Sequence, residues 1–264
     1  MLSQGVAVEK SKGKVKSRQD WAWEFLRRNP KFREAWPAIS KSFELHRIAG
    51  THVTEVAFNE RDSTFEPWGC LFCDAPTQPP TLGPLWNPRK SGEVLHLTAR
   101  HRRANDHTDV FDLAGLHCQV TMFIDRNGTQ HLLFRENVET LQVCITGASM
   151  REPVVLLADA SAPKRVVKAR LRALACIMEL QNSGHLLAGS CSPQPRTERL
   201  DKILVALDAW LKGANYREIG VSLYGRRRVE EDWADPGRHM LDHVRRAVRR
   251  GRSLIEGGYL EFLC

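Results

Sequence analysis

Alternating apolar residues in the middle of the chain constrain its fold more than any other feature. Segment 118–124 alternates in this way, the apolar segment 131–134 follows it, and the dipeptide Asn127-Gly128 lies between them. Asn-Gly favours the tight turn that joins two antiparallel strands, because both residues accept positive backbone φ angles. The sequence therefore predicts a β-hairpin at this point.

Further strand candidates surround this hairpin, and helical patterns follow it. Residues 141–145 alternate, and 153–158 is a continuous apolar run that indicates a better-buried strand. With the short candidate 94–97, these segments predict an antiparallel sheet of about four strands. Apolar residues then recur at helical spacing over 163–181 and 201–212. Strands followed by helices predict the α+β class.

The N-terminal part of the chain predicts a small helical domain. Residues 1–18 are polar and lysine-rich, and we expect a flexible basic tail there. A helix capped by Asp20 is predicted to run to Pro30. A second helix begins near Lys31 and should cross Pro37 poorly, because proline lacks the backbone N–H that a helix needs.

Aromatic residues and prolines mark the rest of this N-terminal part. Trp21, Trp23 and Trp36 favour a minor aromatic core, with a partner-binding surface as the alternative. Six prolines between positions 67 and 88 predict a largely irregular segment. Within it, large apolar side chains should hold the segment against an apolar surface: Trp68, Phe72, Leu82 and Trp86.

A helix-turn-helix pattern lies near the C-terminal end. Gly213 ends the helix 201–212, and Asn215 with Glu218 forms a box of N-terminal capping residues for the next helix. Ile219, Leu223 and, less firmly, Tyr216 are expected to face inward. Gly220 would let the preceding helix cross closely. This order of elements is typical of the scaffold helix in a helix-turn-helix domain.

The next predicted helix begins at Asp235-Pro236 and carries an arginine-rich face. Its apolar stripe is Met240, Leu241, Val244, Val248 and Ile255. Arginine suits DNA because its planar guanidinium can bind a phosphate or a guanine edge in two places. A solvated surface helix is the simpler alternative. The candidate DNA-binding residues are Arg226, Arg227, Arg228, Arg238, His239, Asp242, Arg245, Arg246 and Arg249.

The net charge of the chain supports this assignment. There are 39 Lys and Arg against 31 Asp and Glu, which gives +8. Residues 236–252 contribute +5, and Arg226 to Arg228 contribute +3. A concentrated positive charge favours an anionic partner, most simply nucleic acid.

Other classes of protein are disfavoured. No apolar segment has the length of a signal peptide core or a membrane span, and we expect a soluble, cytoplasmic protein. The seven cysteines are expected to be reduced and mostly buried. Cys70 and Cys73 have metal-site spacing, but no second ligand pair follows, so core packing is favoured. Catalytic motifs are absent, so we expect no enzyme, no catalytic residue, no metal and no cofactor.

The chain resembles a family of proteobacterial regulators encoded on integrative and conjugative elements, the FseA-type excision activators. The resemblance covers roughly residues 20–88 and 130–260. In the C-terminal half it rests on residues 204–213, 216–219, 223–225, 229–233, 244–250 and 257–259. In the N-terminal half it rests on 21–30 and on Trp68-Gly69.

The resemblance implies a transcriptional activator of an excision-factor gene, controlled by an antiactivator protein of the same domain family. Double-stranded promoter DNA and that antiactivator are the expected partners, and RNA polymerase is a third candidate. The alternative is an antiactivator-like interaction protein that does not bind DNA. The expected organisation is a tail over 1–18, a regulator-like domain over 19–98, and a C-terminal domain over 110–264. That last domain has its sheet over 110–160, its helices over 163–264 and its helix-turn-helix at about 200–256.

Overall fold

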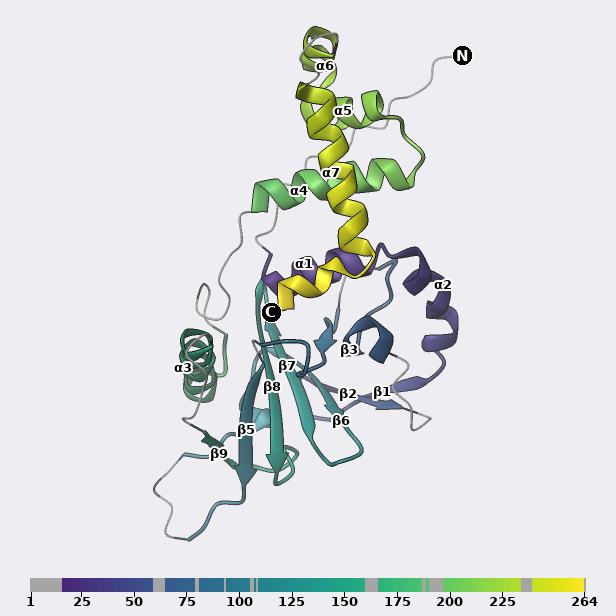
Figure 1. Cartoon of the computed structure of the whole chain (residues 1–264). Coiled ribbons are helices and arrows are strands. Elements are labelled where there is room, and N and C mark those ends of the chain that lie inside the picture. Colours follow the sequence, from purple (N-terminus) through teal and green to yellow (C-terminus); the bar gives the residue numbers. More distant parts are fainter. Residues whose placement is uncertain are drawn as a thin grey trace. The chain divides into compact units, whose positions relative to one another are not determined.

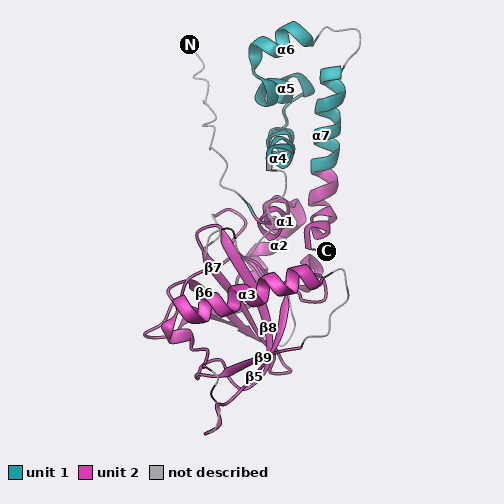
Figure 2. Ribbon diagram, turned by 90° about the vertical axis from the view of Figure 1, so that its left-hand side faces the viewer, with its two compact units in different colours: residues 1–16, 194–251 teal, residues 17–193, 252–264 magenta. Residues whose placement is uncertain are grey.

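The structure is a computed structural model of the whole chain. It describes residues 16–58, 65–78, 81–92, 94–104, 107, 109–159, 166–186, 189, 197–233 and 239–263. The chain divides into two compact units, coloured separately in Figure 2. The helical unit comprises residues 1–16 and 194–251, and the sheet unit comprises 17–193 and 252–264. The predicted tail over 1–18 lies almost entirely outside the described residues.

Strands and helices follow the α+β order that the sequence predicts (Figure 1). The strands are β1 (Phe43–Arg47), β2 (Val53–Phe58), β3 (Cys70–Phe72), β4 (Leu85–Trp86), β5 (Leu95–Arg100), β6 (Gln119–Ile124), β7 (Gln130–Glu136), β8 (Glu139–Gly147) and β9 (Val155–Ala158). The helices are α1 (Arg18–Leu26), α2 (Pro30–Ile39), α3 (Val167–Ser183), α4 (Thr197–Leu211), α5 (Tyr216–Tyr224), α6 (Arg226–Asp232) and α7 (His239–Ile255), with 3₁₀ turns η1 (Glu66–Trp68), η2 (Leu113–Gly115) and η3 (Gly258–Leu263).

The main sheet is larger than predicted and is mixed. It has seven strands in the order β1-β2-β6-β7-β8-β5-β9. The predicted hairpin is confirmed as β6 and β7, with Val120 opposite Phe134, and β8 continues the antiparallel pairing. The expectation of about four antiparallel strands is corrected, because β2 pairs parallel with β6 and β5 pairs parallel with β8. Strands from residues 43–58 and 95–100 thus share one sheet with those from 119–158.

The strand predicted to be the better-buried one, β9, lies at the edge of the sheet. Only Val155 of its four residues is buried, and Leu157 is 44% exposed. An edge strand has a neighbour on one side only, here β5, so its apolar run does not become enclosed. The prediction of a well-buried strand was therefore wrong.

The two faces of the sheet are covered by different layers. On one face α3 packs its buried residues Cys176, Ile177 and Leu180 against the strands (Figure 2). On the other face the small β3-β4 sheet is held by polar contacts. Gln142 accepts a hydrogen bond from the Trp86 N–H at 3.0 Å and donates to the Trp86 carbonyl at 2.6 Å. The proline-rich segment is therefore anchored to the sheet, with Phe72, Leu82 and Trp86 buried.

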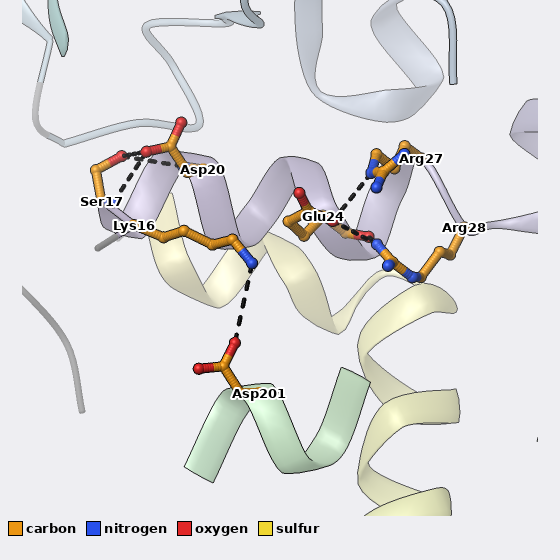
Figure 3. Close-up of polar contacts among 7 residues, drawn as sticks. All are labelled: Lys16, Ser17, Asp20, Glu24, Arg27, Arg28 and Asp201. Atoms are coloured by element: carbon orange, nitrogen blue, oxygen red, sulfur yellow. Dashed lines mark hydrogen bonds and ion pairs between the residues drawn. The ribbon is translucent and has the colours of Figure 1, made fainter. Parts of the chain in front are cut away.

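Helix α1 starts earlier than predicted. Ser17 is its N-cap, and Asp20 is the third helical residue, whose carboxylate accepts a hydrogen bond from the Ser17 N–H (Figure 3). The cap is thus Ser17 and not Asp20, because the two residues form a reciprocal capping box. Farther along α1, Glu24 forms ion pairs with Arg27 and Arg28 (Figure 3).

Helix α2 continues through Pro37, contrary to the prediction. Proline removes one backbone donor, but the next turn still closes, since the Ser40 N–H donates to the Trp36 carbonyl at 2.8 Å. Trp36 lies in a cluster of aromatic rings, 6.3 Å from Phe43 and 6.3 Å from Phe65 between ring centroids. Trp21 and Trp23 are fully buried, which confirms the aromatic core.

The C-terminal end of the chain packs against this N-terminal helix. Phe262 of η3 stacks on Phe25 of α1 with ring centroids 5.9 Å apart, and the Arg18 side chain donates to the Phe262 carbonyl at 3.1 Å. The Asn29 amide donates to the Ile255 carbonyl at 2.6 Å. Residues 252–263 therefore complete the core of the sheet unit rather than that of the helical unit.

Candidate nucleic-acid interface

Helix α5 begins at the capping box that the sequence predicts. The Asn215 side chain accepts hydrogen bonds from the N–H groups of Arg217 and Glu218, both at 3.0 Å. Glu218 Oε2 accepts one from the Asn215 N–H at 2.8 Å. These bonds satisfy donors that a helix start leaves unpaired. The box sets the residue at which the chain turns from α4 into α5.

A single residue, Gly225, joins α5 to α6. Its φ of +87° lies in a region that favours glycine, so the chain can turn there without a longer loop. Arg226, Arg227 and Arg228 form the first turn of α6, and Val229 anchors the helix with no exposed surface. We predicted that the helix after α5 starts near position 236 and that the arginine triplet precedes it. The triplet does lie between α5 and the arginine-rich helix, but it belongs to a helix of its own, α6, which was not predicted.

Helices α4, α5 and α7 of this unit share one apolar core. Ala206 of α4, Ile219 of α5, and Val244 and Val248 of α7 are buried together. Trp210 and Trp233 pack against them. α4, α5 and α6 are stacked beside α7 (Figure 2). The buried side of the arginine-rich helix α7 is therefore held in place by this core.

The role predicted for Gly220 is corrected. A Cβ atom built at this position would lie 3.0 Å from Cζ3 of Trp233, which follows α6. The small residue therefore admits a tryptophan ring from the α6 side, and not the preceding helix α4. The close approach follows from the short α5–α6 connection, which the sequence pattern did not predict.

The outer face of α7 carries the predicted basic residues. His239, Asp242, Arg245, Arg246 and Arg249 are all exposed, opposite the buried valines of the same helix. Arg246 and Arg249 have no ion-pair partner within the described part of the chain. Arg238 and the predicted Asp235-Pro236 start lie outside the described residues.

Arg245 and Arg228 each lie against a tyrosine of α5. The Cζ of Arg245 is 5.8 Å from the ring centroid of Tyr216, and that of Arg228 is 5.8 Å from the ring of Tyr224. Tyr216 is 42% exposed, so the expectation that it faces inward was wrong. A rise of about 12 Å separates the two tyrosines along α5. The sequence offered a signal that we missed: a tyrosine at each end of this short helix.

Acidic residues accompany the arginine triplet on α6. Arg227 forms an ion pair with Glu231 at 2.9 Å, and Arg228 forms one with Asp232 at 3.4 Å. The side chain of Arg227 is 93% exposed and that of Arg228 is 67% exposed. Ion pairs this exposed contribute little to stability. Their order also opposes the helix dipole, which favours acids at the start of a helix and bases at its end. Helix stability therefore does not account for the arginines at the start of α6.

The arrangement suits an extended anion. Guanidinium groups bind phosphate oxygens through paired N–H donors and keep their charge at all physiological pH values. The arginines on the first turn of α6 and on the outer face of α7 belong to one compact unit. Such a surface can neutralise several phosphates of one nucleic-acid backbone.

The Cys70 and Cys73 pair is buried in the sheet unit. The two sulfur atoms are 2.8 Å apart, and neither side chain is exposed. Burial, together with the hydrogen bond to Cys70, raises the pKa of the Cys73 thiol well above its usual range. Cys118, Cys144 and Cys176 are also buried free thiols, as predicted. Cys191 and Cys264 lie outside the described residues.

None of the helices among the described residues combines the length and apolar character needed to cross a bilayer. Within the same residues, no three His, Cys, Asp or Glu side chains converge as ligands for a metal ion.

Two family models match this chain. Residues 155–263 match a model described as a T6SS transcription factor, DNA binding domain, and residues 14–73 match a proteobacterial transcriptional regulator-like domain. No curated protein matches the chain. The first model spans α3 to α7, which includes the arginine-bearing surface described above. The protein is therefore a transcriptional regulator with a DNA-binding domain in its C-terminal half.

Proposed function

We propose that this regulator activates transcription by placing the exposed arginines of its helical unit on double-stranded promoter DNA. The observation that carries the proposal is the outer face of α7, where Arg246 and Arg249 are exposed opposite the buried Val244 and Val248. Neither arginine has an ion-pair partner within the described residues. Exposed arginines held by a rigid helix are suited to phosphates and base edges.

In this proposal α7 enters the groove and α6 contacts the backbone. His239, Asp242, Arg245, Arg246 and Arg249 would face the base edges, and so would Arg238. Arg226, Arg227 and Arg228 would bind phosphates. The second half of α6 holds Glu230, Glu231 and Asp232, whose carboxylates would be repelled if the whole helix entered a groove. Only the first turn of α6 is therefore assigned to DNA.

The regulated gene follows from the resemblance to FseA-type activators. We infer that the chain activates an excision-factor gene of an integrative and conjugative element, and that an antiactivator of the same domain family controls it. RNA polymerase is a further candidate partner for the sheet unit. The matched family model names a T6SS transcription factor, so type VI secretion genes are the competing target.

The test is DNA binding measured by fluorescence anisotropy at several salt concentrations. The variant Arg245→Ala/Arg249→Ala removes two proposed base-edge contacts and should lower affinity for the promoter at least about tenfold, with a smaller loss on unrelated DNA. Arg226→Ala/Arg227→Ala removes two proposed phosphate contacts and should lower the slope of log affinity against log salt by about two. The control Arg102→Ala/Arg103→Ala removes the same charge from an exposed segment of the sheet unit and should leave both affinity and slope unchanged. An Arg245→Ala/Arg249→Ala variant that binds like this control would refute the assignment of α7.

A second experiment addresses the alternative and the target. Binding that is weak and identical for all DNA sequences would instead support a protein-interaction role. Chromatin immunoprecipitation in a cell that carries the element should recover DNA upstream of the excision-factor gene. Recovery of type VI secretion promoters alone would contradict the excision role but keep the DNA-binding function.

A further inference from the structure

Helix α3 carries apolar side chains on its outer face as well as on its inner one. Cys176, Ile177 and Leu180 are buried against the sheet, whereas Leu171 and Met178 are 61% and 64% exposed. Figure 2 shows α3 lying across the sheet, with its outer face toward the viewer. Exposed side chains of this size on one helix face are unusual for a surface that only meets water.

These residues form a continuous stripe. Leu171, Ala175 and Met178 follow steps of four and three along the helix, which places them on one face, and all three are exposed. Leu174 lies beside them and is half-buried. The small side chain of Ala175 near the middle would let a second helix approach closely. We call Leu171, Leu174, Ala175 and Met178 the α3 stripe.

Charged residues beside the α3 stripe are basic near the start of the helix and acidic near its end. Lys168 and Arg172 lie on one flank near the start of the helix, and Glu179 lies on the same flank near its end. Within the described part of the chain none of these three side chains forms an ion pair. The stripe therefore has a basic end and an acidic end on one flank, and both ends lack partners there.

We propose that the α3 stripe binds the α3 stripe of a second copy of this chain, antiparallel and about a two-fold axis. With the axis between Leu174 and Ala175, Leu171 lies opposite the partner's Met178. A two-fold axis keeps each flank with the same flank of the other copy and reverses its direction. Glu179 of the partner subunit then lies level with the space between Lys168 and Arg172, and the same contact recurs at the other end.

The positions of the charges on this flank favour a second α3 helix as the partner, and they favour its antiparallel orientation. A parallel pair about a two-fold axis would carry each flank to the opposite side of the interface, so Lys168 and Arg172 could not meet the partner's Glu179. In the antiparallel pair both unpaired ends gain partners of opposite charge. One helix pair buries less than a standard interface, so the dimer should form with micromolar affinity. This inference does not depend on DNA binding.

The first test is sedimentation equilibrium of the full chain from about 1 to 300 µM, a range that brackets micromolar dissociation constants. The wild type should change from monomer to dimer within it. Leu171→Glu places a charge in the stripe near the partner's Glu179 and should raise the dissociation constant at least about 100-fold. Val205→Glu, on an exposed apolar position of α4, is the matched control and should leave the dissociation constant unchanged.

The second test concerns direction. Glu179→Lys should weaken the dimer about three- to tenfold, because like charges then meet at two symmetric places. Adding Lys168→Glu and Arg172→Glu to that variant should restore the wild-type affinity, and circular dichroism would verify the fold of each variant. A wild type that stays monomeric, equal effects of Leu171→Glu and Val205→Glu, or a triple variant without rescue would each overturn the proposal.

Discussion

The guanidinium of Arg245 lies over the ring of Tyr216, with 5.8 Å between Cζ and the ring centroid. Arg245 also lies 3.8 Å from Asp242 on its own helix. The two contacts orient a side chain that would otherwise sample many rotamers in solvent. An arginine oriented before binding loses less entropy when it meets DNA. In the proposed function, Tyr216 would therefore hold Arg245 ready for the groove.

Replacement of Tyr216 tests this ring contact. Tyr216→Leu keeps an apolar side chain but removes the aromatic face, and affinity for promoter DNA should fall about two- to fivefold, since exposed cation–π contacts contribute about 0.5–1 kcal/mol. Tyr216→Phe keeps the face and should bind like the wild type. Anisotropy titrations at one salt concentration measure both. Equal losses in the two variants would show that the hydroxyl acts, and not the ring.

The acidic end of α6 should restrain DNA binding. Glu231→Gln removes the partner of Arg227 and one charge that repels phosphates, so affinity at low salt should rise about threefold and the gain should fade at high salt. The free energy of unfolding should change by less than about 0.5 kcal/mol, because the pair is exposed. Gel-shift titrations at two salt concentrations give the comparison.

The exposed Glu34 of α2 provides the control for this experiment. Glu34→Gln removes the same charge from the sheet unit and should leave DNA affinity unchanged. If both variants gain affinity equally, the effect arises from net charge alone. Weaker binding by Glu231→Gln would contradict the prediction, and it would mean that the ion pair with Arg227 holds this arginine in its binding position.

Local features of the fold could be predicted from the sequence. The Asn215–Glu218 box and the hairpin around Asn127-Gly128 depend on residues a few positions apart, and both are present. Ser17 and Asp20 show the limit of such patterns, because either residue can cap a helix and the sequence alone does not select one. The apolar face of α7 was predictable for the same local reason, since Val244 and Val248 recur at helical spacing.

Features that depend on distant residues could not be predicted in this way. The parallel pairing of Val53 with Val120 joins segments far apart in the chain, and no local pattern encodes it. Phe262 likewise stacks on Phe25 only after the whole sheet unit has formed. Helix α6 escaped prediction because its seven residues hold one apolar side chain, Val229, and so show no periodicity. The helical setting of Arg226, Arg227 and Arg228 was therefore not predicted.

Position 220 should distinguish a small side chain from a larger one. Gly220→Ala gains about 1 kcal/mol of helix propensity, and its Cβ must displace the Trp233 ring by a few tenths of an ångström from 3.0 Å. These effects oppose each other, so the alanine variant should unfold within about 1 kcal/mol of the wild type. Gly220→Val adds two methyl groups at the same contact and should cost about 2 kcal/mol. Urea unfolding followed by tryptophan fluorescence compares them, and a valine variant as stable as the alanine one would contradict this packing.

Asp125 should make the stability of the hairpin depend on pH. Its Oδ1 accepts hydrogen bonds from the N–H groups of Asn127 and Thr129 at 2.8 and 3.0 Å, and its Oδ2 lies 3.2 Å from His131 Nε2. Burial alone would raise the pKa of Asp125. The hydrogen bonds from His131, Thr129 and Asn127 outweigh burial and hold the pKa below its ordinary value of 3.8.

A lowered pKa means that the folded chain stabilises the ionised carboxylate. That stability is fully present above pH 3.8 and is lost as the pH falls toward the lower folded value. Asp125→Asn keeps the shape of the side chain and removes its charge, so it should cost about 1 kcal/mol at pH 7. The difference from the wild type should shrink as the pH falls below 3.8, measured by urea unfolding at each pH.

Asp109→Asn, at an exposed position, is the control and should show no such trend. A cost for Asp125→Asn that is the same at every pH would mean that the turn depends on the shape of this side chain and not on its charge.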